Sequence, residues 1–283
     1  MTLSASVGVV RPVLSSDLPA VERILAQDPV AHCFLAARVR QGGLDPWRLG
    51  GEMLGFFDDD GLHSAVYHGA NLVPVGTDAR ARGAFADRLR TFGRRCSSIV
   101  GPAEEVLDLW RQLEPSWGPA REVRACQPLL AMSEDPVIAD DPAVRLATQA
   151  DLEVLVPACV AMFTAEVGVS PVARGMGPAY RARIAEIVAA GRSFVRIEDG
   201  VVVFKAEVGS ASHDVCQVQG VWVDPDRRGT GVSVPGMATV VRLARSSIAP
   251  TVSLYVNDFN THARRCYDAV GFRQVGEFAT ILF

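Results

Sequence analysis

Hydrophobic positions in the second half of the chain follow two periodicities. Apolar residues recur at helical spacing over 152–167 and 180–190, which predicts two helices. Apolar runs over 194–197 and 201–208 flank an Asp-Gly pair that is typical of a hairpin turn. The order of elements favours a mixed α/β fold. The rest of the pattern predicts a strand over 215–223, a helix over 235–246, a strand over 252–256, a helix over 261–270 and a pair of strands over 272–283.

The first half of the chain shows a similar order of elements, less clearly. The pattern again begins with a hairpin, continues through a strand and a helix, and ends with a second strand and helix. This similarity indicates that the two halves share one fold. The predicted elements are strands over 53–57 and 62–67 about a turn at 58–61, a strand over 70–75, a helix over 84–92, a strand over 98–100 and a helix over 103–113.

A short sequence repeat supports a duplication. Arg11 and Asp17 recur as Arg145 and Asp151, each 134 positions later. In both copies the aspartate follows a short strand and a polar turn, where its carboxylate can accept the first free N–H groups of a helix. The alternative is that strand, aspartate cap and helix recur by chance.

Length and composition agree with two folded domains. The 283 residues exceed the usual size of one domain, and 49% hydrophobic with 21% charged residues is typical of globular proteins. The segment 133–142 is acidic and interrupted by prolines, as linkers tend to be. We therefore predict one domain over residues 1–135 and a second over residues 143–283.

The composition also excludes several classes of partner. A net charge of -4 gives no basic footprint for nucleic acid. No signal-like leader and no apolar run of membrane-spanning length occur, so no membrane partner is expected. The six cysteines form no CxxC pair and the five histidines no HExxH motif, so we expect no metal and a cytoplasmic location.

The most distinctive segment is residues 221–233, in which a β-run meets a proline and passes through two glycines into an apolar helix. Gly229 and Gly231 allow main-chain conformations that a side chain forbids, and they let a ligand approach the N–H groups. Those groups and the positive end of the helix can hold an anion, with Arg227 and Arg228 adding mobile positive charge. Taken alone, such a turn is equally typical of an ordinary surface turn with solvated arginines.

Two blocks of sequence together resemble the GNAT acyltransferase superfamily. The acetyl-CoA loop of that family reads Arg or Gln, any two residues, Gly, any residue, then Gly or Ala, and Arg228, Gly231 and Ser233 stand at those positions. Ser233 departs from the last position, but serine is small and keeps its N–H group. The block over 252–272, VSLYVNDFNTHARRCYDAVGF, is similar to the family's downstream motif. A Walker loop is excluded because no Gly-Lys-Ser or Gly-Lys-Thr follows, and the spacing differs from a Rossmann fingerprint.

The resemblance implies transfer of an acetyl group from acetyl-CoA to a primary amine of a small molecule or a protein. It implies that Tyr267 protonates the leaving CoA thiolate and that Asn260 lies beside the pantetheine arm, with main-chain groups of 221–223 polarising the acetyl carbonyl. From the residues alone, Asn260 can simply cap a helix and Tyr267 can simply pack against a sheet. The implied acetyl-CoA site comprises Val221, Trp222, Val223, Arg228, Gly229, Thr230, Gly231, Val232, Ser233, Asn260 and Tyr267.

The resemblance also implies two tandem GNAT-like α/β domains with mixed sheets, of which the second is catalytic. The first is then a degenerate copy, because residues 77–84 stand at the place of the loop and contain a single glycine. We therefore expect one acetyl-CoA site per chain.

The general base is not identified by the sequence. Many relatives place a glutamate on the central strand, whereas this strand carries Gln217 and Gln219, which cannot take a proton at neutral pH. The remaining candidates are Glu207, Asp214, Glu166, a chain of waters and the C-terminal carboxylate of the chain.

Two other functions are compatible with the same residues. A non-catalytic acyl-CoA sensor or interaction module is favoured if the glutamines mark lost chemistry, and a nucleotide-binding enzyme could use the same loop. The acceptor and the oligomeric state leave no signature in the sequence. Direct attack by an amine requires no nucleophilic cysteine, so Cys216 and Cys266 are expected to be small buried apolar residues.

Overall fold

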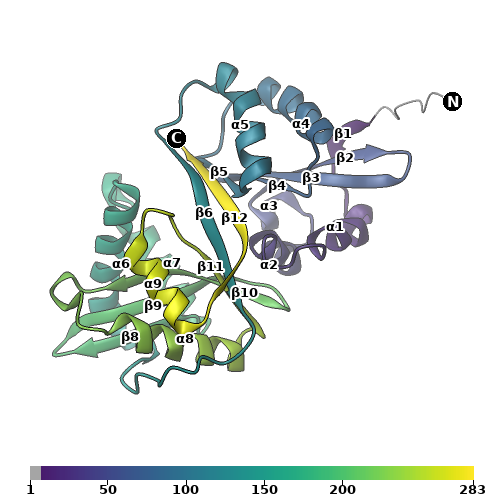
Figure 1. Cartoon of the computed structure of the whole chain (residues 1–283). Helices are drawn as coiled ribbons and strands as arrows, with labels where there is room; N and C mark the ends of the chain where they lie inside the picture. The colour runs from purple at the N-terminus through teal and green to yellow at the C-terminus, as the bar shows by residue number, and fades with distance from the viewer. Residues whose placement is uncertain (1–7) are drawn as a thin grey trace. The chain divides into compact units, whose positions relative to one another are not determined.

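The computed structural model describes residues 8–283 and divides the chain into two compact units (Figure 1). The first unit contains the described residues up to Leu130 together with two later segments, Tyr255–Phe259 and Gln274–Phe283. The second unit contains Ala131–Leu254 and Asn260–Arg273. Each unit is a sheet covered by helices.

In the first unit the strands lie in the order β1-β2-β3-β4-β5-β12-β6. Its sheet has a hydrophobic core on each face, one formed with α1 and α2 and the other with α4 and α5. The elements are β1 (Val9–Pro12), α1 (Leu18–Leu25), α2 (Cys33–Gly42), α3 (Pro46–Leu49), β2 (Gly51–Asp58), β3 (Gly61–Gly69), β4 (Asn71–Val75), α4 (Ala79–Phe92), β5 (Ser98–Pro102), α5 (Ala103–Trp117) and β6 (Glu122–Met132).

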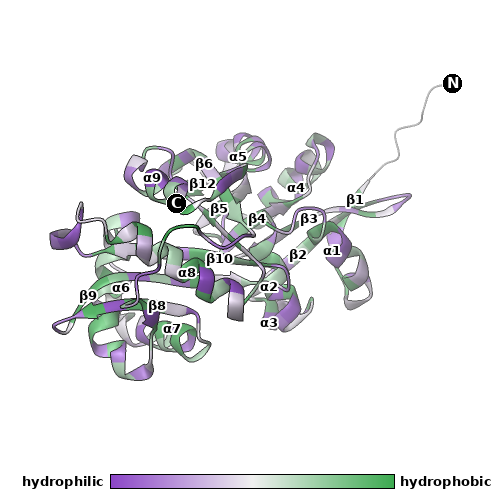
Figure 2. Ribbon diagram, turned by 60° about the horizontal axis from the view of Figure 1, so that its bottom comes forward, coloured by the Kyte–Doolittle hydropathy of each residue, from purple (hydrophilic) through white to green (hydrophobic). Residues whose placement is uncertain are grey.

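In the second unit the strands lie in the order β11-β10-β9-β8-β7. Hydrophobic residues concentrate on the strands, and hydrophilic residues on the outer faces of the helices (Figure 2). The elements are β7 (Arg145–Leu146), α6 (Leu152–Val167), α7 (Gly177–Ala189), β8 (Ser193–Glu198), β9 (Val201–Ala211), β10 (Val215–Val223), α8 (Ser233–Ser247), β11 (Thr251–Tyr255) and α9 (Thr261–Val270), before β12 (Arg273–Leu282).

The two halves of the chain repeat one order of elements, which confirms the predicted mixed α/β fold of tandem type. The repeat extends to single side chains, since Arg11 pairs with Asp17 at 2.8 Å and Arg145 pairs with Asp151 at 2.8 Å. Both aspartates stand at the start of a helix, but neither caps it. Each carboxylate instead accepts the N–H group of the residue three positions earlier. The prediction that it accepts the first free N–H groups of the following helix is therefore wrong.

The C-terminal segment forms one strand, and the predicted pair of strands over 272–283 is therefore wrong. β12 pairs antiparallel with β5 from Phe278↔Pro102 to Leu282↔Ser98, and it lies beside β6 (Figure 1). The end of the chain thus completes the sheet of the first unit. The hydrophobic pattern could not reveal this partner, because the pairing joins residues far apart in the sequence.

Candidate active site

The chain between β10 and α8 forms a turn built on two left-handed glycines. Asp224 opens the turn by accepting the N–H group of Asp226 at 2.9 Å. Gly229 follows with a φ of +78° and Gly231 with a φ of +86°, conformations that favour glycine. Helix α8 then begins at Ser233, two residues before the predicted start.

The N–H groups at the end of this turn are available to a ligand. Among the residues that the structure describes, those of Gly229, Gly231, Val232 and Ser233 donate to no protein acceptor, and no side chain caps α8. The first turn of a helix leaves such groups for side chains, water or ligands, and the helix dipole favours an anion there. The turn can therefore hold a phosphate through its main chain.

The two arginines of the turn each have a polar partner. Arg227 Nη2 lies 3.0 Å from Glu198 Oε2 of β8. Arg228 Nε donates to the main-chain oxygen of Val223 at 3.2 Å. Both residues are exposed.

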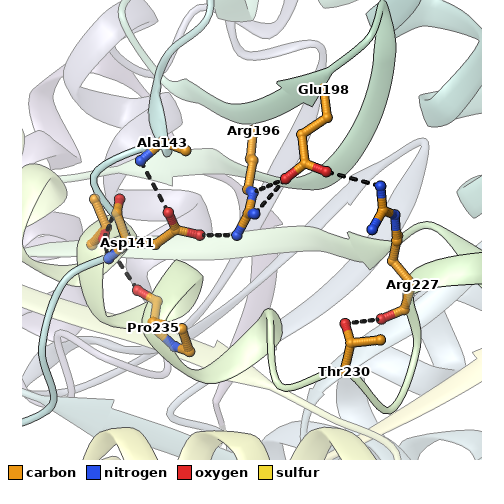
Figure 3. Close-up of polar contacts among 8 residues, drawn as sticks. Asp141, Ala143, Arg196, Glu198, Arg227, Thr230 and Pro235 are labelled. Carbon is orange, nitrogen blue, oxygen red and sulfur yellow. Dashed lines mark hydrogen bonds and ion pairs between the residues drawn. The ribbon is translucent and has the colours of Figure 1, made fainter.

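An ion-pair chain leads from Arg227 to the linker (Figure 3). Glu198 accepts from Arg196 Nε at 2.8 Å, and Arg196 Nη1 reaches Asp141 Oδ2 at 2.7 Å. Asp141 is buried, and its main-chain N–H group donates to Thr239 Oγ1 of α8 at 2.9 Å. Asp141 thus contacts β8 through its carboxylate and α8 through its main chain.

Strands β10 and β11 part before β10 reaches the turn. They pair in parallel only from Val215↔Thr251 to Gln217↔Ser253, whereas β10 continues to Val223. A bulge interrupts the ladder to β9 after Gln219, where Gly220 has a φ of +60°. The main chain of Val221, Trp222 and Val223 therefore borders the gap where β11 no longer pairs. Gly220 was missed at the level of sequence, although a glycine within a strand is a known sign of a bulge.

Helix α9 carries the two side chains that the family resemblance singled out. Asn260 caps it by accepting the N–H group of Ala263 at 3.2 Å, and Gly271 ends it in the left-handed conformation, as predicted. Tyr267 is buried edge-on against Phe272, with ring centroids 5.9 Å apart.

Burial keeps the phenol of Tyr267 protonated. Desolvation raises the pKa of Tyr267 far above its usual value, and the nearby Cys266 and Glu166 raise it further. Ser233 at the start of α8 is close enough to Cys266 to oppose the rise that burial causes in the pKa of this thiol, so the turn and α9 lie together. Cys216 and Cys266 are both buried, as predicted.

The candidate bases stand in different parts of the fold. Asp214 is exposed and paired with His213 at 2.9 Å, at the end of β10 remote from Val221. The C-terminal Phe283 belongs to the first unit, where it packs against Trp110 and Trp117. Glu207 and Glu166 remain in the second unit with Tyr267.

The corresponding turn of the first unit already holds carboxylates of its own. Glu105 Oε2 accepts the N–H and the hydroxyl of Thr77 at 2.8 and 2.6 Å, and Asp78 accepts the N–H of Ala81 at 2.7 Å. Arg82 is buried there and bonds Asp108 at 2.5 Å. A phosphate would have to displace these carboxylates, which supports the predicted single site per chain.

Over residues 8–283, no helix is both long and apolar enough to cross a membrane. No cluster of three or more His, Cys, Asp or Glu side chains that could hold a metal ion occurs in the same part of the chain.

Comparisons with known proteins agree with this geometry. Residues 162–272 match the acetyltransferase (GNAT) family, and residues 51–155 match a domain of unknown function, DUF4081. No curated protein matches the sequence significantly.

Solved structures share the fold over the whole chain. A GNAT-family acetyltransferase from Colwellia psychrerythraea has a TM-score of 0.58 at 11% identity, covering 97% of this chain and 99% of its own. A GCN5-related N-acetyltransferase from Sphaerobacter thermophilus has a TM-score of 0.58 at 15% identity, with 96% and 94% covered. A tandem GNAT protein from the clavulanic acid biosynthesis pathway has a TM-score of 0.56 at 12% identity, with 98% of both chains covered.

The fold and the parted strands define an acetyltransferase-like α/β protein. The second half of the chain matches the GNAT family over residues 162–272, and the whole chain has the fold of solved GNAT proteins, one of them a tandem GNAT protein.

Proposed function

We propose that the protein is an N-acetyltransferase that moves an acetyl group from acetyl-CoA to a primary amine of a small molecule or a protein. One observation carries the proposal: the start of α8 has unpartnered N–H groups, and the strand that leads into this turn, β10, has already parted from β11. The same unit places the buried phenol of Tyr267 on the helix that Ser233 contacts.

The residues fit acetyl-CoA in three places. The N–H groups of Gly229 to Ser233, with Arg228 and Thr230 beside them, suit the pyrophosphate. The main chain of Val221, Trp222 and Val223 suits the pantetheine arm and can donate to the acetyl oxygen as negative charge develops. The side-chain oxygen of Asn260 accepts the N–H group that it caps in α9. Its amide N–H₂ group can therefore donate to pantetheine.

Tyr267 is the proposed general acid. Its raised pKa keeps the hydroxyl protonated. It can therefore donate to the sulfur as the carbon–sulfur bond breaks.

The test is Tyr267→Phe, assayed by thiol release from acetyl-CoA on a panel of primary amines. We expect kcat to fall about 100-fold, because positioned acid catalysis contributes at least that much, while acetyl-CoA affinity by calorimetry stays unchanged. Tyr67→Phe is the matched control: its hydroxyl bonds Gly50 O at 2.9 Å in the first unit, so its loss affects stability and not kcat. An unchanged kcat in Tyr267→Phe rules out the acid role.

A non-catalytic acyl-CoA sensor is the second candidate, favoured by the glutamines Gln217 and Gln219 on β10. Calorimetry and thiol release on the wild-type chain separate the two functions. Tight binding of acetyl-CoA without turnover of any amine on the panel supports the sensor. Stabilisation by ATP or NAD and not by acetyl-CoA supports a nucleotide-binding enzyme instead.

A further inference from the structure

A buried charged network lies beneath the bulge of β10. Lys205 and Glu207 stand two residues apart on β9, so their side chains share one face of the sheet. Lys205 is fully buried, and its Nζ lies 3.2 Å from Glu207 Oε2. Gln219 Nε2 of β10 donates to the other carboxylate oxygen, Oε1, at 3.0 Å. A β-carbon at Gly220 would lie 3.1 Å from Lys205 Nζ and 3.3 Å from Glu207 Cδ.

This network touches the place where the acetyl group is proposed to sit. Gly220 immediately precedes the Val221–Val223 main chain, so its bulge links Glu207 to the parted strands. Within the network the carboxylate is nearer solvent, because Glu207 is 9% exposed and Lys205 is 0% exposed. Each carboxylate oxygen keeps a lone pair beyond the one that Lys205 or Gln219 occupies.

We propose that Glu207 accepts the proton of the attacking amine and that Lys205 is the positioning residue that holds this carboxylate in place; the inference rests on the proposed acetyl transfer. The amine nitrogen bonds to the thioester carbon, and Glu207 takes one proton from that nitrogen. The carbon–sulfur bond then breaks with its electron pair on sulfur, and Tyr267 supplies the proton of the thiol. Exchange with solvent returns the proton from Glu207 to Tyr267.

Other titratable groups also face Glu207. From α6, Cys159 Sγ lies 3.3 Å from Lys205 Nζ, and from α7, Tyr180 donates to the main-chain oxygen of Cys159 at 3.2 Å. Burial raises the pKa of Cys159 and raises that of Tyr180 to about 12, so both stay neutral near pH 7. Desolvation lowers the pKa of Lys205, but the carboxylate of Glu207 and hydrogen bonds to it outweigh this effect, so the pKa is raised and Lys205 stays charged. Glu207 is the acidic side chain that Lys205 and Gln219 both contact.

The experiment compares pH profiles of kcat for Lys205→Met and for the double variant Glu207→Gln with Lys205→Met. Removing both charges avoids a lone buried cation, so the double variant should fold, which its melting temperature verifies. We expect it to lose about 100-fold or more in kcat, with acetyl-CoA affinity unchanged. Lys205→Met alone should keep activity at high pH, with the acid limb of its profile moved up by about one pH unit, because an adjacent cation favours an ionised carboxylate.

The control is Glu186→Gln, the same chemical change at an exposed position of α7, which should leave kcat unchanged. A folded double variant with wild-type kcat and an unmoved acid limb overturns the role of Glu207. If the acid limb of the pH profile of kcat for Lys205→Met coincides with that of the wild type, the role of Lys205 is overturned. A wild-type chain that neither binds acetyl-CoA nor releases thiol instead refutes the proposed function, and this inference with it.

Discussion

Removal of the carboxylate of Glu198 should strengthen acetyl-CoA binding. Glu198 Oε2 lies 3.0 Å from Arg227 Nη2 and thereby neutralises part of the positive charge beside the turn. Glu198→Gln keeps the size of the side chain and a carbonyl oxygen for Arg196, which also retains Asp141 at 2.7 Å. The change therefore frees Arg227 with little disturbance of β8.

The exposure of Arg227 sets the size of the expected change in acetyl-CoA affinity. Half of the Arg227 side chain is exposed, and ion pairs on such surfaces contribute about 0.2–1 kcal/mol. Freeing the guanidinium for a phosphate should lower Kd by up to about fivefold, since 1.4 kcal/mol corresponds to a factor of ten. The gain should shrink with added salt, because surface charges are screened.

Calorimetric titration with acetyl-CoA at low and physiological salt measures the effect. The same substitution in an Arg227→Ala background is the control, because loss of a negative charge alone favours an anion whether or not the arginine is present. The two effects then differ by the coupling of Glu198 and Arg227. An unchanged or higher Kd for Glu198→Gln would contradict the expected effect. An equal fall in Kd in the Arg227→Ala background would show that Arg227 is not the cause.

Two further substitutions test the turn and the duplicated ion pair. Gly231→Ala forces a side chain to a φ of +86°, at about 1 kcal/mol, and should weaken acetyl-CoA binding about fivefold by calorimetry. Gly200→Ala, in a hairpin at +77°, should carry the strain without changing Kd, and equal Kd changes in both would contradict the role of the turn. Asp151→Asn should cost about 2 kcal/mol of unfolding free energy at pH 7, measured by urea denaturation. Hydrogen bonds from Arg145 lower the pKa of Asp151, so this stability is present above about pH 4 and is lost as the pH falls further; a pH-independent difference would contradict the pairing. Asp17→Asn should behave alike in the first unit.

Local patterns predicted the elements of the second half closely. The helix over 152–167, the strand over 215–223 and the helix over 261–270 have the bounds that the structure shows. Each begins or ends at residues whose own chemistry fixes the boundary, such as the Asn260 cap and the left-handed Gly271. Helix periodicity and capping are properties of neighbouring residues, so the sequence reveals them directly.

Features that depend on distant residues were missed. The partner of β12 and the pairing of Arg227 with Glu198 follow from tertiary packing, which the spacing of residues does not encode. Lys205 and Glu207 did leave a signal, because two charges at alternate positions stand within an otherwise apolar run. Charges in such a run are stable when buried only if they are paired.

Calorimetric titration of the full chain with acetyl-CoA tests whether the turn before α8 forms the acetyl-CoA site of the protein. The turn before α8 offers unpartnered N–H groups, whereas the corresponding turn of the first unit is filled by Glu105 and Asp78. We predict one acetyl-CoA binding site per chain. Gly231→Ala should lower its affinity, and Glu105→Gln should leave the affinity unchanged. Absence of binding, or two equivalent sites per chain, would contradict it.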